Sequence, residues 1–458
     1  MSMAIEDIDR KFFFHPFTNT RTHEKTGPLT MVTGSGSTIV DTQGRSYLDA
    51  MAGLWCVNIG YGNIEMAEVL RRQAEKLAYY HTFASMGNEP VAELAERLVT
   101  MAPGPMSKVF FGNSGSDAND SQVKMVWYYN NVLGRPQKKK IIARSRGYHG
   151  VTVMSASLCG LPGMHKAFDL PLPMVKHVRA PHRLWENASG LSDEEFVAAL
   201  ADDLEQTILA EGPETVAAFI AEPIQAAGGV IVPPAGYFPA IQEVLRRYDV
   251  LLIADEVVCG FGRTGNAFGS NTFDIEPDMM TVAKGITSAY MPLSACIVSE
   301  KVWDVLRSGS DTYGVFQHGY TYSAHPLAAA AALANLSIIE RDGLTQQAKS
   351  RGDYLNGRLR AVFAGHPMVA EVRGFGLLGA VEFASSTSPL TPFDPIGSFS
   401  TPVVARMREL GIISRALPNA DSIAFSPPFV VTEAEIDSMV EGARQAVDDV
   451  TAALNLAS

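Results

Sequence analysis

Cysteine is scarce in this sequence of 458 residues, which contains only Cys56, Cys159, Cys259 and Cys296. These residues lie far apart and form no CxxC pair, so neither a disulfide framework nor a cysteine-ligated zinc site is expected. The ten histidines likewise form no HExxH motif or comparable cluster of ligands. We therefore expect reduced thiols, a cytoplasmic protein and no catalytic metal.

Positive charge is also in short supply. The chain has 37 lysines and arginines against 49 aspartates and glutamates, which gives a net charge of −12. Nucleic acids and anionic membranes are bound mainly through Lys and Arg, so this balance disfavours both kinds of partner. We interpret the one basic run, residues 138–140, as a solvated loop before a strand.

Long apolar runs are missing as well. Nowhere do eighteen apolar residues follow one another, and the N-terminus lacks the apolar segment of a signal peptide, so we expect neither a membrane span nor secretion. The composition is 47% hydrophobic with 39 glycines and shows no repeat or low-complexity stretch. A chain of this length suffices for two domains, or for one large α/β domain with an appendage.

The segment 250–285 holds the most informative pattern. Its two short apolar runs, Val250–Ile253 and Met279–Val282, are each long enough for one buried strand. Asp255 follows the first run and Lys284 follows the second. Because the carboxyl ends of strands line the ligand crevice of an open parallel sheet, we expect both side chains to face one ligand.

A lysine at such a crevice can lose its proton and attack a carbonyl, while an aspartate there can hold a proton on a ring nitrogen. Lys284 and Asp255 together therefore match the requirements of pyridoxal phosphate chemistry. Two simpler interpretations stay open for these residues alone: a buried ion pair that closes two strands, and a solvated lysine at the start of a loop.

Three further segments place polar groups near such an edge. Residues 216–221 predict a buried strand that ends at Glu222. Residues 108–131 predict a strand, a loop of small residues and a helix, whose free N–H groups and dipole suit a phosphate, although an ordinary N-cap has the same composition. The predicted strand 141–143 leads into the segment SRGYHG, residues 145–150.

Two segments, 260–265 and 374–379, formally match GxGxxG. A dinucleotide site requires a strand before this motif and a helix after it. Turn residues follow Gly265, and AVEF after Gly379 continues like a strand. We therefore expect no nicotinamide or flavin site.

The segments DEVVCGFGRTG at 255–265 and PDMMTVAKGITSAYMPL at 277–293 resemble the cofactor-lysine signature of class III, fold-type I aminotransferases. The similarity extends from GLWCVNIGYG at 53–62 through SPPFVV at 426–431. It implies an α/β fold: a large domain with a mostly parallel central sheet flanked by helices, plus a smaller α+β domain from both termini. The implied bounds are 1–62 for the N-terminal arm and hairpin, 63–326 for the large cofactor-binding domain and 327–458 for the C-terminal small domain.

The resemblance also implies roles for individual residues. Tyr148 would stack on the cofactor ring, and Thr321 would contact the phosphate of the cofactor bound to the other subunit of a homodimer, or possible tetramer, with shared sites. The implied cofactor-binding residues are Gly115, Ser116, Tyr148, Glu222, Asp255, Val257, Lys284 and Thr321. The implied substrate-binding residues are Trp55, Phe83, Tyr148 and Arg415, the last being a switch arginine that binds a carboxylate and swings aside for an uncharged substrate.

Three positions depart from the usual family pattern: Asp117 replaces Glu, Ala324 replaces Gly, and Val258 replaces a Gln that would hydrogen-bond the cofactor ring oxygen. The overall pattern looks like an ω-amine:pyruvate aminotransferase. Such an enzyme moves an amino group from an ω-amino acid or primary amine to a keto acid such as pyruvate, with ping-pong kinetics through pyridoxamine phosphate. A racemase or aminomutase of the same fold, and a cofactor-binding regulator, are the alternatives.

Overall fold

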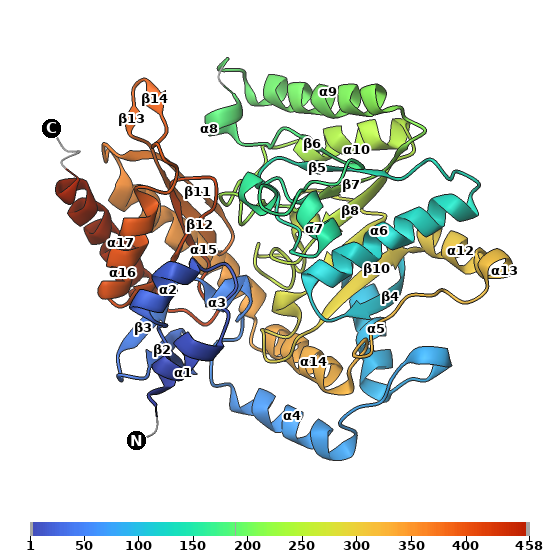
Figure 1. Ribbon diagram of the computed structural model, residues 1–458, viewed down its shortest axis with the longest axis horizontal. Helices are drawn as coiled ribbons and strands as arrows, with labels where there is room; N and C mark the ends of the chain where they lie inside the picture. Colours follow the sequence, from blue (N-terminus) through green and yellow to red (C-terminus); the bar gives the residue numbers. More distant parts are fainter. Residues whose placement is uncertain (1–2, 188, 455–458) are drawn as a thin grey trace.

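The computed structural model describes residues 3–187 and 189–454. Its central feature is a seven-stranded sheet (Figure 1). In spatial order the strands are β4 (Met106–Gly112), β10 (Ser294–Ser299), β9 (Met279–Val282), β8 (Leu251–Asp255), β7 (Val216–Ala221), β5 (Lys140–Arg144) and β6 (Val175–Val178). The neighbours from β9 to β6 pair in parallel, and β10 is antiparallel to both β9 and β4. The expectation of a mostly parallel central sheet is therefore confirmed.

Both faces of this sheet are buried, which explains why its strands read as continuous apolar runs. Successive side chains of a strand point to opposite faces. Along β8, Leu251 and Ile253 join a core cluster with residues of α6 (Gly115–Val132), whereas Leu252 joins a second cluster with residues of α10 (Tyr237–Arg247). The polar residue that ends the run, Asp255, is left at the carboxyl edge of the sheet.

The two ends of the chain build smaller sheets on the left of Figure 1. One consists of β1 (Met31–Ser35), β2 (Thr38–Asp41), β3 (Ser46–Asp49) and β15 (Ile412–Ile413). The other consists of β11 (Val369–Phe375), β12 (Leu378–Phe383), β17 (Ser422–Phe425) and β16 (Arg415–Ala416), beside the small hairpin β13 (Ser386–Thr387) and β14 (Leu390–Thr391). Because β15 pairs with β3, the first and last parts of the chain are joined. The domain bounds given above stay a prediction.

The remaining helices surround these sheets. The longer ones are α1 (Ile5–Phe12), α4 (Ile64–Lys76), α5 (Glu89–Met101), α9 (Asp193–Glu211), α12 (Glu300–Ser308), α14 (Pro326–Arg341), α15 (Leu344–Phe363), α16 (Ser400–Glu409) and α17 (Glu433–Ala453). The shorter ones are α2 (Thr20–Thr26), α3 (Ala52–Trp55), α7 (Val153–Leu158), α8 (Arg183–Glu186), α11 (Gly269–Thr272) and α13 (Ser310–Tyr313), with η1 (Phe83–Ser85), η2 (Pro162–Met164) and η3 (Lys284–Ile286). Across the described residues, no helix combines the length and the apolar character needed to cross a bilayer.

The basic run at 138–140 is not a solvated loop, so that interpretation was wrong. Lys138 is only 5% exposed, and its Nζ donates to the carbonyl oxygens of Pro213 (3.2 Å) and Tyr248 (3.1 Å). Lys140 already belongs to β5. Burial lowers the pKa of Lys138. The ammonium group donates to carbonyl oxygens of two distant chain segments that meet at this point. The charges of residues 138–140 alone do not reveal such contacts.

The two GxGxxG segments contact each other. The segment 374–379 forms the tip of the hairpin β11–β12, whose turn contains Gly376 at φ 53°. A Cβ on Gly376 would lie 2.5 Å from the carbonyl oxygen of Arg263, so the close approach requires glycine. Leu377 N–H donates to that same oxygen at 3.0 Å. The expected strand after Gly379 is confirmed as β12.

The segment 288–299 is rich in apolar residues, but β10 occupies only Ser294–Ser299. The residues before it form turns, with Ser288 and Ala289 at positive φ. The buried Ser288 Oγ donates to Asn335 on α14 at 2.6 Å. This polar contact with α14 holds the segment away from the sheet.

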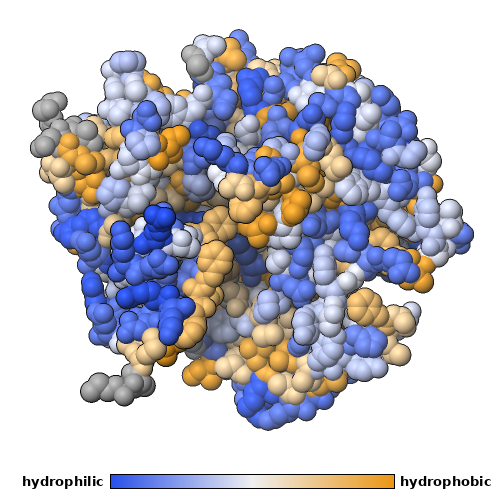
Figure 2. Space-filling model, in the orientation of Figure 1, coloured by the Kyte–Doolittle hydropathy of each residue, from blue (hydrophilic) through white to orange (hydrophobic). Residues whose placement is uncertain are grey.

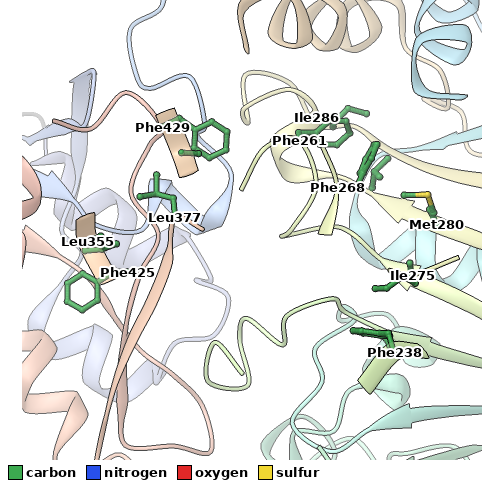
Figure 3. Close-up of a cluster of buried hydrophobic side chains, with 14 of the residues drawn as sticks. Phe238, Phe261, Phe268, Ile275, Met280, Ile286, Leu355, Leu377, Phe425 and Phe429 are labelled. Atoms are coloured by element: carbon green, nitrogen blue, oxygen red, sulfur yellow. The ribbon is translucent and has the colours of Figure 1, made fainter. Parts of the chain in front are cut away.

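Buried aromatic and aliphatic side chains connect the central sheet with the C-terminal sheet. Figure 3 shows Phe261, Phe268 and Met280 on one side and Leu377 and Phe425 on the other, all within one buried hydrophobic cluster. The C-terminal part of the chain is therefore packed against the edge of the sheet that carries Asp255 and Lys284.

A buried ion cluster makes a second connection. On β11, Arg373 Nη1 lies 2.6 Å from Glu371 Oε2 and 2.5 Å from Glu382 Oε2 on β12. Arg373 Nε donates to the carbonyl of Gly229 at 2.8 Å, and His182 Nε2 lies 3.3 Å from Glu382. Burial alone would raise the pKa of Glu382, but Arg373 and His182 outweigh burial and lower it.

We expect Arg373→Met to lower the free energy of unfolding by about 3–5 kcal/mol, because it leaves the buried Glu382 carboxylate without its cation. Urea unfolding measures this change. The exposed ion pair of Arg71 is the control, since Arg71→Met should cost less than about 1 kcal/mol. Because the pKa of Glu382 is lower in the folded protein than in the unfolded chain, its ionised carboxylate stabilises the fold at pH values above the unfolded pKa. This stabilisation is lost as the pH falls and the carboxylate takes up a proton. The difference in unfolding free energy between wild type and Arg373→Met should therefore shrink in acid. Equal losses in the two variants would contradict the prediction.

Candidate functional site

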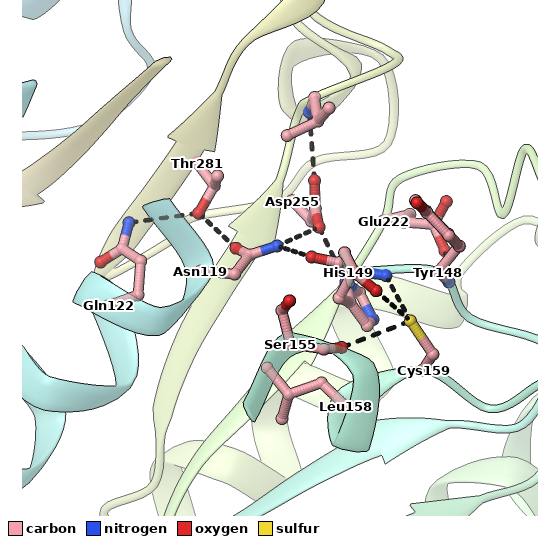
Figure 4. Close-up of polar contacts among 12 residues, drawn as sticks. Asn119, Gln122, Tyr148, His149, Ser155, Leu158, Cys159, Glu222, Asp255 and Thr281 are labelled. Atoms are coloured by element: carbon pink, nitrogen blue, oxygen red, sulfur yellow. Dashed lines mark hydrogen bonds and ion pairs between the residues drawn. The ribbon is translucent and has the colours of Figure 1, made fainter. Parts of the chain in front are cut away.

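Asp255 lies at the end of β8, and hydrogen bonds from three directions orient its buried carboxylate (Figure 4). Oδ2 accepts from Asn119 Nδ2 at 2.9 Å and from His149 Nδ1 at 2.7 Å. Oδ1 accepts from the N–H of Val257 at 3.2 Å. Oδ2 is thus the more heavily bonded oxygen, and Oδ1 has capacity for a further donor.

Sequence reasoning missed Asn119, His149 and Thr281, although the structure brings all three to Asp255. Thr281 Oγ1 donates to Asn119 Oδ1 at 2.8 Å, and both side chains are fully buried. A signal was available for two of them: His149 directly follows Tyr148 in a loop after a strand, and Thr281 is the one polar residue of the apolar run MMTV. Asn119 gave no such signal.

Lys284 follows β9 and begins the 3-10 helix η3. Its φ of 47° lies in the left-handed region, a strained conformation that is common at functional sites. The side chain is partly buried, and burial lowers the pKa of its amine, while Cys56, Asp255 and Glu222 act in the opposite direction. A lysine whose pKa is lowered spends more of its time as a neutral amine, which is the nucleophilic form.

The indole of Trp55 lies close to two cations. Lys284 Nζ is 5.4 Å from the ring centroid, and the guanidinium carbon of Arg415 is 5.6 Å from it. Trp55 belongs to a buried apolar cluster against which Tyr148 packs. The structure therefore brings four of the predicted site residues, Trp55, Tyr148, Lys284 and Arg415, to one place.

Glu222 ends the sequence of β7 as predicted, and its carboxylate accepts from Tyr148 N–H at 2.9 Å and from Ala226 N–H at 3.2 Å. Burial raises its pKa, against the effect of His149. Burial also raises the pKa of Tyr148 to about 12, so the phenol stays neutral at neutral pH. Glu222 thereby fixes the backbone of the loop that carries Tyr148 and His149.

The predicted phosphate loop is the N-terminus of α6. Ser114 caps the helix, and its Oγ accepts from Asp117 N–H at 3.2 Å. The Asp117 carboxylate reaches back to the N–H groups of Asn113 and Ser114, so it performs the capping role even though it is shorter than Glu. Within the described chain, the N–H groups of Gly115 and Ser116 have no acceptor, and together with the helix dipole they suit a phosphate.

Two predicted site residues lie elsewhere on the protomer. Phe83 is 47% exposed, with His81 as its aromatic neighbour at 6.1 Å. Thr321 is exposed in the turn before α14, and its carbonyl accepts from the hydroxyl of Tyr79. Their assignment to a site shared between subunits stays a prediction.

Comparison with known proteins identifies the family. The model of the family "Aminotransferase class-III" matches residues 20–447. The diaminobutyrate–2-oxoglutarate transaminase of Halomonas elongata is 50% identical, with 98% of this chain and 96% of the relative aligned. The gamma aminobutyrate transaminase 3 of Solanum lycopersicum is 46% identical over 90% of this chain and 79% of the relative. This chain therefore belongs to the class III aminotransferases.

A solved structure agrees with this assignment. The ω-transaminase from Pseudomonas jessenii in complex with PMP is 47% identical, covers 100% of both chains and superposes with a TM-score of 0.97. Class III aminotransferases use pyridoxal phosphate, and the racemase or aminomutase alternative is not favoured. The site fits this cofactor: two free N–H groups suit its phosphate, Lys284 suits its aldehyde, and Asp255 Oδ1 retains acceptor capacity for its ring nitrogen.

Proposed function

We propose that this aminotransferase takes the amino group of a primary amine or ω-amino acid and delivers it to a keto acid such as pyruvate. The arrangement around Trp55 carries this proposal. A lysine amine and a guanidinium approach the same indole, so a nucleophile, an aromatic surface and a cation for a carboxylate lie together. The names of the relatives, which include a gamma aminobutyrate transaminase and an ω-transaminase, support amines that are remote from a carboxylate.

When bound, pyridoxal phosphate supplies an electron sink for the negative charge that develops at the substrate Cα. Lys284 would hold the cofactor through its amine, and in the neutral form that its burial favours, the same amine could take the proton from the substrate Cα. Asp255 keeps the ring nitrogen protonated through its charge. Tyr148 and Val257, which lies beside Gly115, would contact the cofactor ring, and the N–H groups of Gly115 and Ser116 would hold the phosphate.

Arg415 is the proposed carboxylate-binding residue. Burial lowers its pKa, while the phenol of Tyr148 has the opposite effect, and no carboxylate pairs with it among the described residues. It is therefore available for the acceptor. Because its neighbour is an indole rather than a partner that fixes the guanidinium, the side chain is free to move aside for an uncharged amine.

We propose a homodimer on the evidence of exposed aromatic residues. Figure 2 shows a strip of apolar surface, in pale orange, beside the hydrophilic surface of α1 and α2. The N-terminal phenylalanines are exposed by 72%, 56%, 80% and 71% at Phe12, Phe13, Phe14 and Phe17. Exposed apolar surface of this kind marks an interaction site. Sedimentation velocity over a range of concentrations tests the assembly, and a lasting monomer would contradict it.

A panel of amines with pyruvate as the acceptor, monitored by the formation of alanine, tests the proposed reaction. The amine alone should bleach the visible absorbance of the bound cofactor, and pyruvate should restore it. A racemase would keep its absorbance with amine alone. Absence of alanine from every amine, together with an intact chromophore, would reject the proposal.

We expect Arg415→Leu to raise the KM for pyruvate by about 10–100-fold, because a hydrogen bond to a charged group contributes about 1.5–3 kcal/mol. The half-reaction with an uncharged arylalkylamine should change less than about threefold, because that substrate has no carboxylate to bind. Steady-state and single-turnover kinetics separate the two effects. Arg406→Leu, at a partly exposed arginine that pairs with Glu409 and Asp449, is the control. Equal losses with both substrates would contradict a carboxylate-specific role.

A further inference from the structure

Asn119 is the strongest unassigned feature of the site. Its side chain is fully buried and uses its whole amide. Nδ2 donates to two acceptors, Asp255 Oδ2 at 2.9 Å and the carbonyl of His149 at 2.7 Å, while Oδ1 accepts from Thr281 Oγ1 at 2.8 Å (Figure 4). A reversed amide would place its oxygen against a carboxylate and a carbonyl, both of which are acceptors. Only one orientation of Asn119 therefore satisfies the site.

The hydroxyl of Thr281 enforces this orientation. Gln122 Nε2 lies 3.4 Å from Thr281 Oγ1 and donates to the carbonyl of Met280 at 2.7 Å. A threonine hydroxyl has a single hydrogen, and here it is given to Asn119. The bonds run in one direction, from Gln122 through Thr281 and Asn119 to Asp255, so each donor polarises the next.

The same helix also carries the phosphate loop. Asn119 follows Gly115 and Ser116 by four and three positions, which puts the three residues on one side of the first turns of α6. Helix α6 would therefore serve both ends of a bound cofactor: its free N–H groups suit the phosphate, and its Asn119 bonds the carboxylate proposed for the ring nitrogen.

We propose that Asn119, oriented by Thr281, is a positioning residue that fixes Asp255 Oδ2 and so directs Oδ1 at the ring nitrogen of the cofactor. This inference rests on the proposed role of Asp255. It predicts that substitution of Asn119 weakens binding of a cofactor that has the ring nitrogen but not of an analogue that lacks it. If Asn119 only filled space, its substitution would weaken binding of both ligands equally.

The experiment titrates apoprotein with pyridoxal phosphate and with its analogue in which carbon replaces the ring nitrogen, and measures Kd by quenching of tryptophan fluorescence. Asn119→Leu should raise the Kd for pyridoxal phosphate about 10-fold or more while changing the Kd for the analogue less than about twofold. Thr281→Val should have a smaller effect of the same kind, because the amide of Asn119 is then free to reverse. Thr281→Ser keeps the hydroxyl and should restore wild-type binding.

Equal losses for both ligands would overturn the proposal and assign Asn119 a packing role, and no loss for either ligand would also overturn it. If Asn119→Leu does not fold, as judged by circular dichroism, Thr281→Val and Thr281→Ser decide the question. The quantity compared is again the change in Kd for pyridoxal phosphate relative to the change in Kd for the analogue. The wild-type protein separates this test from the proposed function. If it forms no covalent bond with pyridoxal phosphate, seen as no change in visible absorbance, the proposed function fails instead.

Discussion

Replacing Lys284 by alanine is expected to lower kcat for transamination by at least about 10⁴-fold, because the substitution removes both the nucleophile and the group that moves the substrate proton. The formation of alanine from pyruvate measures the loss. Reduction of the loaded protein with borohydride should attach the cofactor to Lys284 in the wild type and to no residue in the variant. Lys76→Ala, at an exposed ion pair, should keep full activity. A label on another lysine, or activity within tenfold of wild type, would contradict the assignment.

The lowered pKa of Lys284 adds a prediction about pH. An amine whose pKa lies below its ordinary value of about 10.4 becomes neutral, and therefore reactive, at lower pH. Burial is the main cause of this shift, so the rate at which apoprotein bonds to pyridoxal phosphate should reach its plateau below pH 10.4. Stopped-flow absorbance at several pH values measures that rate. A rate that still rises above pH 10.4 would show that the amine is solvated.

The parts of the fold that could be predicted from the sequence are those set by short-range patterns. The buried strands 216–221 and 279–282 have the expected bounds, since strands covered on both faces are continuous apolar runs that end at the first charged or turn residue. The positions of Asp255 at the end of β8 and of Lys284 just after β9, its parallel neighbour, followed from the same pattern. Where two interpretations had equal local support, as for an ion pair against a cofactor site, resemblance to the family decided between them.

The parts that could not be predicted depend on long-range contacts. Asn119 meets Asp255 across 136 positions, and only the packing of α6 on the sheet brings them together. Lys138 is buried because two distant segments present carbonyls to it. The turn at Gly376 depends on Arg263, which lies in another part of the chain. In each case a polar group finds its partner in a segment that a local pattern does not contain.

Asp255→Asn is expected to lower kcat by about 10²–10⁴-fold even though asparagine has nearly the same shape. Asn119 Nδ2 and His149 Nδ1 both point donors at the Oδ2 position, so the amide oxygen of the new residue would turn toward them. Its NH₂ group would then occupy the Oδ1 position and aim a donor at the protonated ring nitrogen. The variant would therefore lose the charge and also reverse the hydrogen bond that holds the ring proton.

An analogue of the cofactor that is methylated on the ring nitrogen tests this explanation, because its positive charge is permanent and needs no carboxylate to keep a proton. We expect the analogue to return part of the lost kcat to Asp255→Asn while it slows the wild type, because a methyl group in place of the ring proton removes the hydrogen bond to Oδ1. Single-turnover kinetics with a reactive amine measure both effects. Activity of Asp255→Asn within tenfold of wild type, or no recovery with the analogue, would show that the charge of Asp255 does not act on the ring nitrogen.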